Sequence, residues 1–374
     1  MSIVSTGRPK PGGPSVGRRS TAGRLGPRGP LWPAWRQQRA VIWAGAALLV
    51  VAAGYILWWR ADMAAYIEAH PLSACDPTQT CDVVGDPAHQ GPAPFLRRYG
   101  TALEDTAGLL VVVPALIGVF LGAPLVARDA EAGTHKLLWT QSVSRSRLLA
   151  VKLGLAASAT AAGTGALSAV FARWWSPALP ELAKARTYGL AENYVWYEAV
   201  PFHSTGPVFV ALSLLALTVG VTAGLLLRRT LVAMAATLAV VAAGQWGLGH
   251  LLPRLARLMP VRTGTARVAD PASPAADPIG IKAPVPGDGW MVRDGFLTGS
   301  GDKLSDQEWG RVLDACPVGR EGPCAARHGV VGRFAEYHPV GQYWPLQWIE
   351  AGICLAAAAA LAAFCLWRIR RRRD

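Results

Sequence analysis

Six apolar stretches of about twenty residues constrain this chain more than any other feature. The stretches cover residues 40–59, 107–127, 151–172, 208–227, 231–252 and 346–367. A helix of this length spans a bilayer, because the hydrocarbon core is about 30 Å thick and a helix rises about 1.5 Å per residue. Charged residues make up only 16% of the 374 residues, and apolar residues make up 52%. The sequence therefore predicts an all-α integral membrane protein with six transmembrane helices.

The basic residues predict how these helices are oriented. Short loops rich in Lys and Arg stay on the cytoplasmic side of a membrane. Residues 1–39 carry eight basic residues and no acidic one, the loop 128–150 is basic, and the last span is followed by a basic run at 368–373. The segments between these basic segments hold more acidic residues than the basic segments themselves do. We expect a multi-pass plasma membrane protein with both the N- and the C-terminus in the cytoplasm.

Changes in composition divide the chain into four parts. The parts are residues 1–39, 40–252, 253–345 and 346–374. The first part is a basic cytoplasmic tail, and its Trp32 and Trp35 suit either a helix in the head-group layer or a simple flank of the first span. The second part holds five spans and the fourth part holds the sixth span with its basic end. The third part is predicted to be a long extracellular loop domain, in which Ser305 and Glu308 form a capping-box pattern that starts a short helix.

Four of the six cysteines fall in segments predicted to lie outside the cell. Two local disulfides, Cys75–Cys81 and Cys316–Cys324, are the simplest pairing in an oxidising compartment. Pairing between the two loops and a metal site are the alternatives. No Cys or His with ligand spacing accompanies either pair, so we expect no metal.

The chain lacks the motifs of nucleotide binding and of catalysis. None of its six lysines is followed by Ser or Thr, as a phosphate-binding loop requires. Neither a His-Glu-x-x-His helix nor a Gly-x-Ser-x-Gly elbow occurs. The formal net charge of +13 is spread in short runs beside apolar stretches, which favours anionic lipid over nucleic acid as the partner. We expect a protein that is not an enzyme and holds no cofactor of its own.

Ionisable residues are nearly absent from the predicted spans. Glu350 is the main exception, and it lies four residues into the last span, where we expect its carboxylate to reach water. His203 is one of five histidines that we expect on the surface of the outer loops. Without a buried acid–base pair, an ATP-driven transporter is favoured over a proton-coupled one. The same scarcity of charge suggests an apolar or amphiphilic substrate.

Two stripes of small residues predict faces on which another helix packs closely. The third span carries Gly154, Ser158 and Ala162 at a spacing of four. The fifth span carries Ala239, Ala243 and Gly247 at the same spacing.

The loop between the second and third spans is the best candidate for a contact surface. It covers residues 128–152 and holds five basic residues. Gly133 can end one helix, and the Thr134 hydroxyl can cap the next one. We expect a short amphipathic helix that lies across the gap between the two spans. An interfacial hairpin whose basic residues contact lipid head groups is the alternative.

The same loop resembles the ABC-2 family of ABC transporter permeases, and most closely its actinobacterial type. The residues that carry the resemblance are Glu131, Gly133, Thr134, Leu137, Leu138, Trp139, Ser144, Arg145 and Lys152. The resemblance implies that Glu131, Gly133 and Thr134 form a coupling elbow. It places Ser144, Arg145 and Lys152 at the start of the third span.

This resemblance implies the membrane subunit of an ABC exporter. Its loop would rest on a separate ATPase subunit that binds ATP and Mg²⁺, and the chain would work as a homodimer or with a related permease. A non-transporting membrane scaffold or sensor that binds a partner through its extracellular loops is the alternative. A membrane enzyme is less favoured, because it would need polar residues clustered at one depth, which the sequence does not reveal.

Overall fold

A computed structural model describes residues 31–69, 95–131, 145–187, 195–270, 273, 276–286 and 289–371. Within these residues, six helices are long and apolar enough to cross a membrane. They cover Gln38–Ala69, Arg97–Asp129, Ser146–Ser176, Gly206–Leu227, Thr230–Ala256 and Val340–Arg371. The six predicted spans are confirmed, and most of the helices run beyond the apolar stretches into polar residues at their ends.

The spans are built from ten segments of secondary structure, some of them short. In chain order these are α1 (Leu31–Ala69), η3 (Leu96–Gly100), α3 (Thr101–Ile117), η4 (Gly118–Gly122), α4 (Pro124–Glu131), α5 (Arg145–Thr187), α7 (Gly206–Leu227), α8 (Thr230–Ala256), η6 (Val340–Gln342) and α11 (Tyr343–Arg371). Helix α1 is continuous from Leu31, so the tryptophan-containing segment before the first span is a flank of the same helix.

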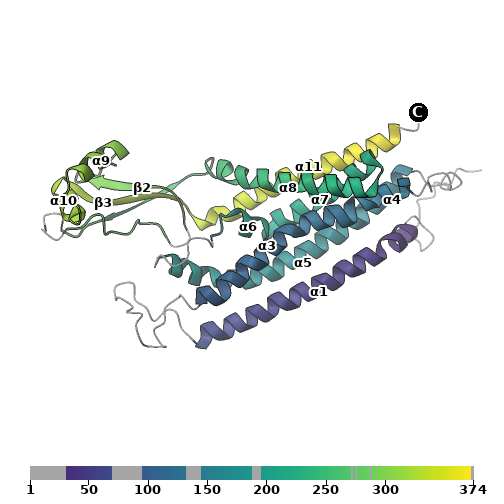
Figure 1. The fold of residues 1–374 in the computed structure, drawn as a ribbon, viewed down its shortest axis with the longest axis horizontal. Coiled ribbons are helices and arrows are strands. Elements are labelled where there is room, and N and C mark those ends of the chain that lie inside the picture. Colours follow the sequence, from purple (N-terminus) through teal and green to yellow (C-terminus); the bar gives the residue numbers. More distant parts are fainter. Residues whose placement is uncertain are drawn as a thin grey trace, which may run out of the picture.

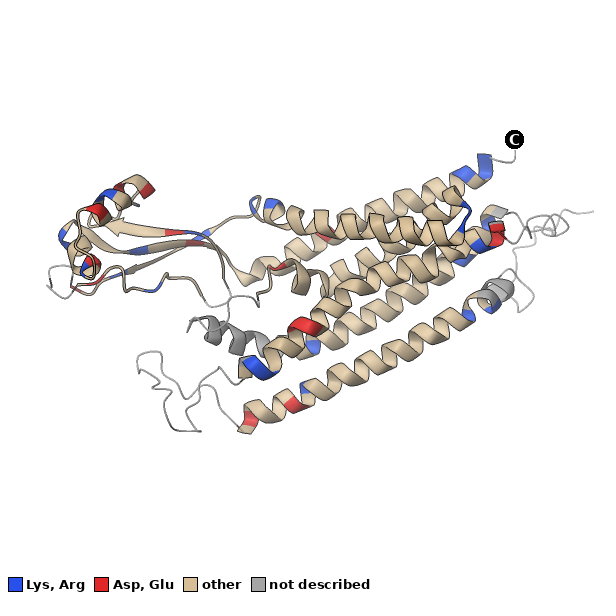
Figure 2. Cartoon of the chain, in the orientation of Figure 1, with Lys and Arg blue, Asp and Glu red and all other residues tan. Residues whose placement is uncertain are grey.

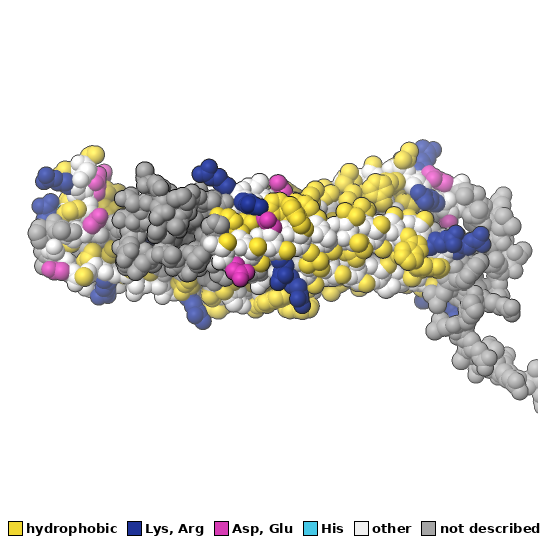
Figure 3. All heavy atoms as spheres, turned by 90° about the horizontal axis from the view of Figure 1, so that it is seen from below, with side chains coloured by type: hydrophobic (Ala, Val, Ile, Leu, Met, Phe, Trp, Pro, Cys, Tyr) yellow, Lys and Arg dark blue, Asp and Glu magenta, His cyan; other side chains and the backbone are white. Residues whose placement is uncertain are grey.

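The helices lie side by side in an elongated bundle with two distinct ends (Figure 1). The start of α1, the end of α4 and the end of α11 lie at one end, which we call the loop end (Figure 1). The β-strands extend from the opposite end, which we call the sheet end (Figure 1). Charged residues of the bundle gather at these two ends (Figure 2), and hydrophobic side chains cover much of the surface between them (Figure 3).

Helix α7 lies at the centre of the bundle and is the most buried of the six spans. It packs against α3, α5, α8 and most extensively against α11. Helix α1 packs mainly on α5 and leaves most of its apolar surface exposed, as expected of a helix that faces lipid.

A π-helical turn interrupts the second span between its two prolines. Pro114 lies inside α3, the turn η4 follows, and Pro124 starts α4. The N–H of Ala123 donates to the carbonyl of Gly118, five residues back, at 2.9 Å. Such turns often occur at functional positions in helices. The two prolines therefore flank a change in helical winding within the second span.

A small domain between α8 and α11 consists of a three-stranded antiparallel sheet with two helices. The strands are β1 (Arg262–Arg267), β2 (Trp290–Thr298) and β3 (Val330–His338), in the order β1-β3-β2. The helices are α9 (Asp306–Asp314) and α10 (Glu321–Arg327). The capping box at Ser305 is confirmed. The sheet was not predicted, because charged residues interrupt its strands and the long segments between them are rich in Pro and Gly.

Candidate functional site

The structure describes only part of the predicted coupling loop. Glu131 ends α4, and Arg145 and Lys152 lie in the first turns of α5. Gly133, Thr134, Leu137, Leu138, Trp139 and Ser144 lie outside the described residues, as does the predicted amphipathic helix. The described part of the site therefore consists of the ends of the spans on either side of the loop.

The Glu131 carboxylate connects the end of the second span to the start of the fifth. Its Oε1 accepts a hydrogen bond from the backbone N–H of Thr230 at 2.7 Å, and its Oε2 accepts one from the Thr230 hydroxyl at 2.6 Å. Thr230 begins α8, where backbone N–H groups lack partners within the helix and the helix dipole favours a negative charge. These hydrogen bonds, and the nearby Arg229, lower the pKa of Glu131.

Lys152 ties the third span to the first and the second. Its Nζ lies 2.6 Å from Oδ2 of Asp129 in α4, and only 8% of the lysine side chain is exposed. The Gln38 side chain of α1 donates to the backbone carbonyl of Lys152 at 3.2 Å. Lys152 therefore holds spans of its own chain together and is not a charge displayed to a partner.

Four glycines bring the second and fourth spans into backbone contact. A Cβ on Gly220 would lie 2.2 Å from the carbonyl oxygen of Gly118, and one on Gly224 would lie 2.5 Å from the carbonyl oxygen of Ala123. A Cβ on Gly122 would likewise lie 2.6 Å from the carbonyl oxygen of Leu217. Such distances leave room only for glycine. The sequence signal was present, since Gly118–Gly122 and Gly220–Gly224 are both Gly-x-x-x-Gly pairs.

The two small-residue stripes predicted from the sequence lie elsewhere. Gly154, Ser158 and Ala162 are exposed on α5, and Ala239, Ala243 and Gly247 are exposed on α8. No neighbouring atom lies within 4 Å of a Cβ built on Gly154 or Gly247. Within the described part of the chain these stripes do not hold two helices together, and their role in packing stays a prediction.

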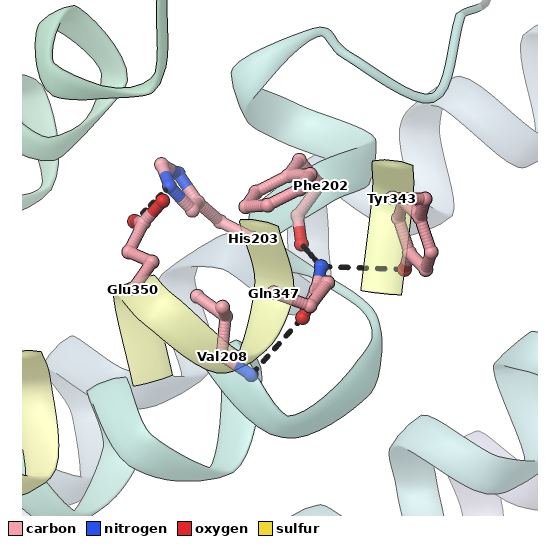
Figure 4. Close-up of polar contacts among 6 residues, drawn as sticks. All are labelled: Phe202, His203, Val208, Tyr343, Gln347 and Glu350. Atoms are coloured by element: carbon pink, nitrogen blue, oxygen red, sulfur yellow. Dashed lines mark hydrogen bonds and ion pairs between the residues drawn. The ribbon is translucent and has the colours of Figure 1, made fainter. Parts of the chain in front are cut away.

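A buried polar cluster lies at the sheet end, where the short helix α6 (Ala199–His203) meets α11 (Figure 4). Gln347 donates to the carbonyl of Phe202 at 2.8 Å and accepts from the N–H of Val208 at 3.2 Å. His203 Nε2 lies 2.7 Å from Oε1 of Glu350. These contacts fix α6 and the start of α7 against α11.

This cluster corrects two predictions. Glu350 was expected to reach water and His203 to lie on the surface, but Glu350 is 0% exposed and His203 is 3% exposed. Both predictions were wrong because α6 folds back into the bundle and covers α11. A turn at Gly206, with φ of +66°, allows this path, and a Cβ there would lie 2.6 Å from Oε1 of Gln347. The structure therefore contains a buried pair of a histidine and a carboxylic acid side chain, which the sequence did not predict and whose expected absence had favoured an ATP-driven over a proton-coupled transporter.

Aromatic rings join the sheet domain to the same end of the bundle. The rings of Tyr197 and Trp290 stack with centroids 4.8 Å apart. The ring centroids of Trp196 and Tyr343 lie 6.1 Å apart. Thr205 and Tyr343 are hydrogen bonded through their hydroxyls at 2.6 Å. We call these five residues the aromatic joint. The joint places the start of β2 directly beside the buried polar cluster.

The structure contains the predicted disulfide Cys316–Cys324, which joins the segment just after α9 to the middle of α10. His328 lies near it, with ligand atoms within 4.8 Å of both sulfurs, so the expectation of no histidine beside this pair was wrong. Both sulfurs are used in the disulfide and are not free to bind a metal. Cys75 and Cys81 lie outside the described residues, and Cys354 and Cys365 are buried free thiols.

Comparison with known proteins agrees with these features of the membrane helices. Residues 46–252 match the family described as ABC-2 membrane transporter related. The matched region covers most of each of the first five spans and both ends of the candidate coupling loop, and it makes up more than half of the chain. It stops before the sheet domain. No curated protein and no solved structure matches significantly. The chain belongs to the ABC-2 membrane transporter-related family, and is a multi-pass membrane protein of the ABC transporter class.

Proposed function

We propose that this chain is the membrane subunit of an ATP-driven exporter and couples to a separate ATPase subunit through residues 128–152. The observation that carries the proposal is the anchoring of both ends of this loop. Glu131 binds the first residue of α8, and Lys152 binds Asp129 of α4. A force on the loop would therefore reach the second, third and fifth spans together.

The glycine contacts support a path from the loop into the bundle. Helix α4 and the π-helical turn η4 lie in backbone contact with α7 through Gly122, Gly220 and Gly224. Helix α7 in turn packs most extensively on α11. Close-packed helices move as units, because dense interiors resist deformation. A shift of α4 would then be passed through α7 to α11 and the sheet end.

The remaining parts of the exporter would come from other chains or from a second copy. ATP and Mg²⁺ would bind to the ATPase, because this chain has no phosphate-binding loop. The loop end would face the cytoplasm and the sheet domain the outside, in agreement with the basic residues at the loop end. Two membrane subunits, identical or related, would form the path between them for an apolar or amphiphilic substrate.

The test is co-purification of this chain in detergent with a candidate ABC ATPase, together with the rate of ATP hydrolysis. The loop variant combines Glu131→Arg, Thr134→Ala and Leu137→Asp. The control is Val318→Asp, which changes a residue that is 97% exposed on the sheet domain. We expect the wild type and the control to bind the ATPase and stimulate hydrolysis, and the loop variant to lose both.

Equal binding by the loop variant would contradict coupling through residues 128–152. A failure of every form to bind any ATPase, with all of them folded, would favour the alternative of a scaffold or sensor. The sheet domain would then be the place to search for the partner.

A further inference from the structure

Four arginines without an ionic partner lie at the loop end, where α7 and α11 finish. Figure 2 shows basic residues gathered at this end of the bundle. We call the four residues the arginine group; they are Arg228 in the turn after α7, and Arg368, Arg370 and Arg371 in the last turn of α11. The proposed coupling through residues 128–152 makes no use of this group, so its presence calls for a separate explanation.

The two helices bring these arginines to the same depth. Helices α7 and α11 both run from the sheet end to the loop end and pack extensively on each other. The Thr222 hydroxyl of α7 and the Cys365 thiol of α11 lie 3.3 Å apart. Arg228 and Arg371 each follow this contact by six residues, which is about 9 Å along a helix. Positive charges from two helices therefore come to one level, at the edge of the membrane-spanning part.

No acidic side chain neutralises the arginine group among the described residues. The two acidic residues described at the loop end, Asp129 and Glu131, are bound to groups of other spans. The neighbouring Arg229, by contrast with the group, lies near Glu131. The segments that continue from this end outside the described residues contain a single acidic residue, Asp374. These segments are residues 1–30, 132–144 and 372–374. The loop end therefore has a surplus of positive charge.

The arginines of α11 hold their guanidinium groups over aromatic rings of the same helix. Arg371 lies over the ring of Trp367, 5.1 Å from its centroid. Arg368 lies over the ring of Phe364 at 5.9 Å, and its buried Nε has no hydrogen-bond partner. Exposed tryptophan beside arginine is typical of the level of lipid head groups. A guanidinium that lacks acceptors within its own chain is well suited to phosphate, whose oxygens accept two N–H groups at once.

The backbone of Arg228 indicates a role beyond ending α7. With a φ of +54°, Arg228 is the one residue other than glycine in the left-handed region within the described part of the chain. This conformation suits glycine and is strained for a residue with a Cβ. Glycine is accordingly the most common residue at such a helix end. The arginine is therefore better explained by what its charge binds than by the turn itself.

We propose that the arginine group binds the head group of an anionic phospholipid. The phosphate would lie between Arg228 and the arginines of α11. The acyl chains would lie along the apolar residues beside Arg228, where Leu227 is 42% and Leu231 is 80% exposed. Unpaired positive charge next to exposed apolar surface fits a lipid better than an acidic protein surface, which would leave the apolar side chains unmatched. A bound lipid would hold the ends of α7 and α11 together, and this role does not depend on the exporter function.

Thermal unfolding in detergent with added phosphatidylglycerol or phosphatidylcholine tests the site, and native mass spectrometry measures the affinity for each lipid. We expect the anionic phosphatidylglycerol to bind more tightly and to raise the Tm more. Without lipid, Arg228→Gly should be at least as stable as wild type, because glycine suits its backbone, but it should bind phosphatidylglycerol about fivefold more weakly. Arg371→Gln should lose a similar factor. Arg257→Gln, which removes an exposed arginine at the sheet end, is the matched control and should keep the wild-type affinity.

Equal affinity for both lipids, or wild-type affinity for phosphatidylglycerol in Arg228→Gly, would overturn the proposal. An equal loss in Arg257→Gln would also overturn it, since the lipid would then respond only to overall charge. The same stabilisation by inorganic phosphate would replace the lipid site with a site for free phosphate. If Arg228→Gly lost a co-purifying ATPase but kept the lipid, the arginine group would be an ATPase contact and the lipid site would fail. If phosphatidylglycerol binds as expected and no ATPase binds, the lipid site stands and the exporter function fails.

Discussion

The two ends of the helical bundle use polar residues in different ways. At the loop end, Glu131 is exposed and receives its hydrogen bonds from the free start of a neighbouring helix. At the sheet end, Gln347 and Glu350 are completely buried and bind groups on α6 and α7. An exposed contact can exchange its partner for water at little cost, whereas a buried one leaves unpaired groups behind.

This difference indicates that the Glu131 contact at the loop end can be exchanged at lower cost than the buried contacts of Gln347 and Glu350, which hold one packing of the sheet end. The glycine contacts between α4 and α7 connect these ends.

The largest effect on thermal stability is expected from Gly220→Ala, which disrupts the helix contact that connects the two ends of the bundle. The added Cβ would lie 2.2 Å from the carbonyl oxygen of Gly118 and 2.7 Å from the backbone nitrogen of Ala123. Backbone atoms cannot rotate away, so the helices must separate, at a cost of about 3 kcal/mol. Thermal unfolding in detergent measures the loss. Gly244→Ala, where no atom lies within 4 Å, is the control, and equal melting of the two variants would refute the close contact.

The next effect is expected at the sheet end from Gln347→Leu. The substitution removes the acceptor of the Val208 N–H and the donor to the Phe202 carbonyl, both buried. Leaving such groups without partners costs about 1–3 kcal/mol each. The melting temperature should fall clearly below that of Gln307→Leu, a control on the exposed surface of α9. A neutral effect of Gln347→Leu would mean that the sheet end is no more tightly held than the loop end.

Removal of the Cys316–Cys324 disulfide should have a smaller and local effect. The bridge closes a short loop with a sequence separation of 8, at the far side of the sheet domain from the bundle. Its loss in the double serine variant should lower the stability of that domain by about 2 kcal/mol. Limited proteolysis between α8 and α11 should become faster, while unfolding of the membrane helices stays the same. An equal loss of stability in the membrane helices would show that the aromatic joint couples their unfolding to that of the sheet domain.

The smallest effect on stability is expected from Glu131→Gln at the loop end. The folded-state pKa of Glu131 lies below its ordinary value, because Thr230 donates to the carboxylate. The contact is therefore present at neutral pH and is lost as pH falls through the lowered pKa. On acidification, wild type should lose the small part of its stability that comes from this contact. Glu131→Gln should not show this loss, because it has no carboxylate to protonate at this position. The exposed Glu104→Gln should behave as wild type, and any equal change in both variants would argue against the capping role.

Several features could be predicted from residues close together in the chain. The six spans follow from apolar stretches, the Ser305 capping box from a spacing of three, and one disulfide from a spacing of eight. The position of Glu131 at the end of the second span could also be predicted, although its partner could not. The sheet escaped prediction, because its strands pair across long intervening segments, one of which contains α9 and α10, and show no clear alternation of polar and apolar residues.

The sequence by itself determined that this chain is a six-helix membrane protein with a basic loop between its second and third spans. Hydrophobic length and charge bias are local properties, and they suffice for that conclusion. Only the tertiary structure decided which polar groups meet. Glu131 and Thr230 are 99 residues apart, and His203 and Glu350 are 147 residues apart. Such pairs depend on how helices dock and on the path of the short helix α6, which no periodicity encodes.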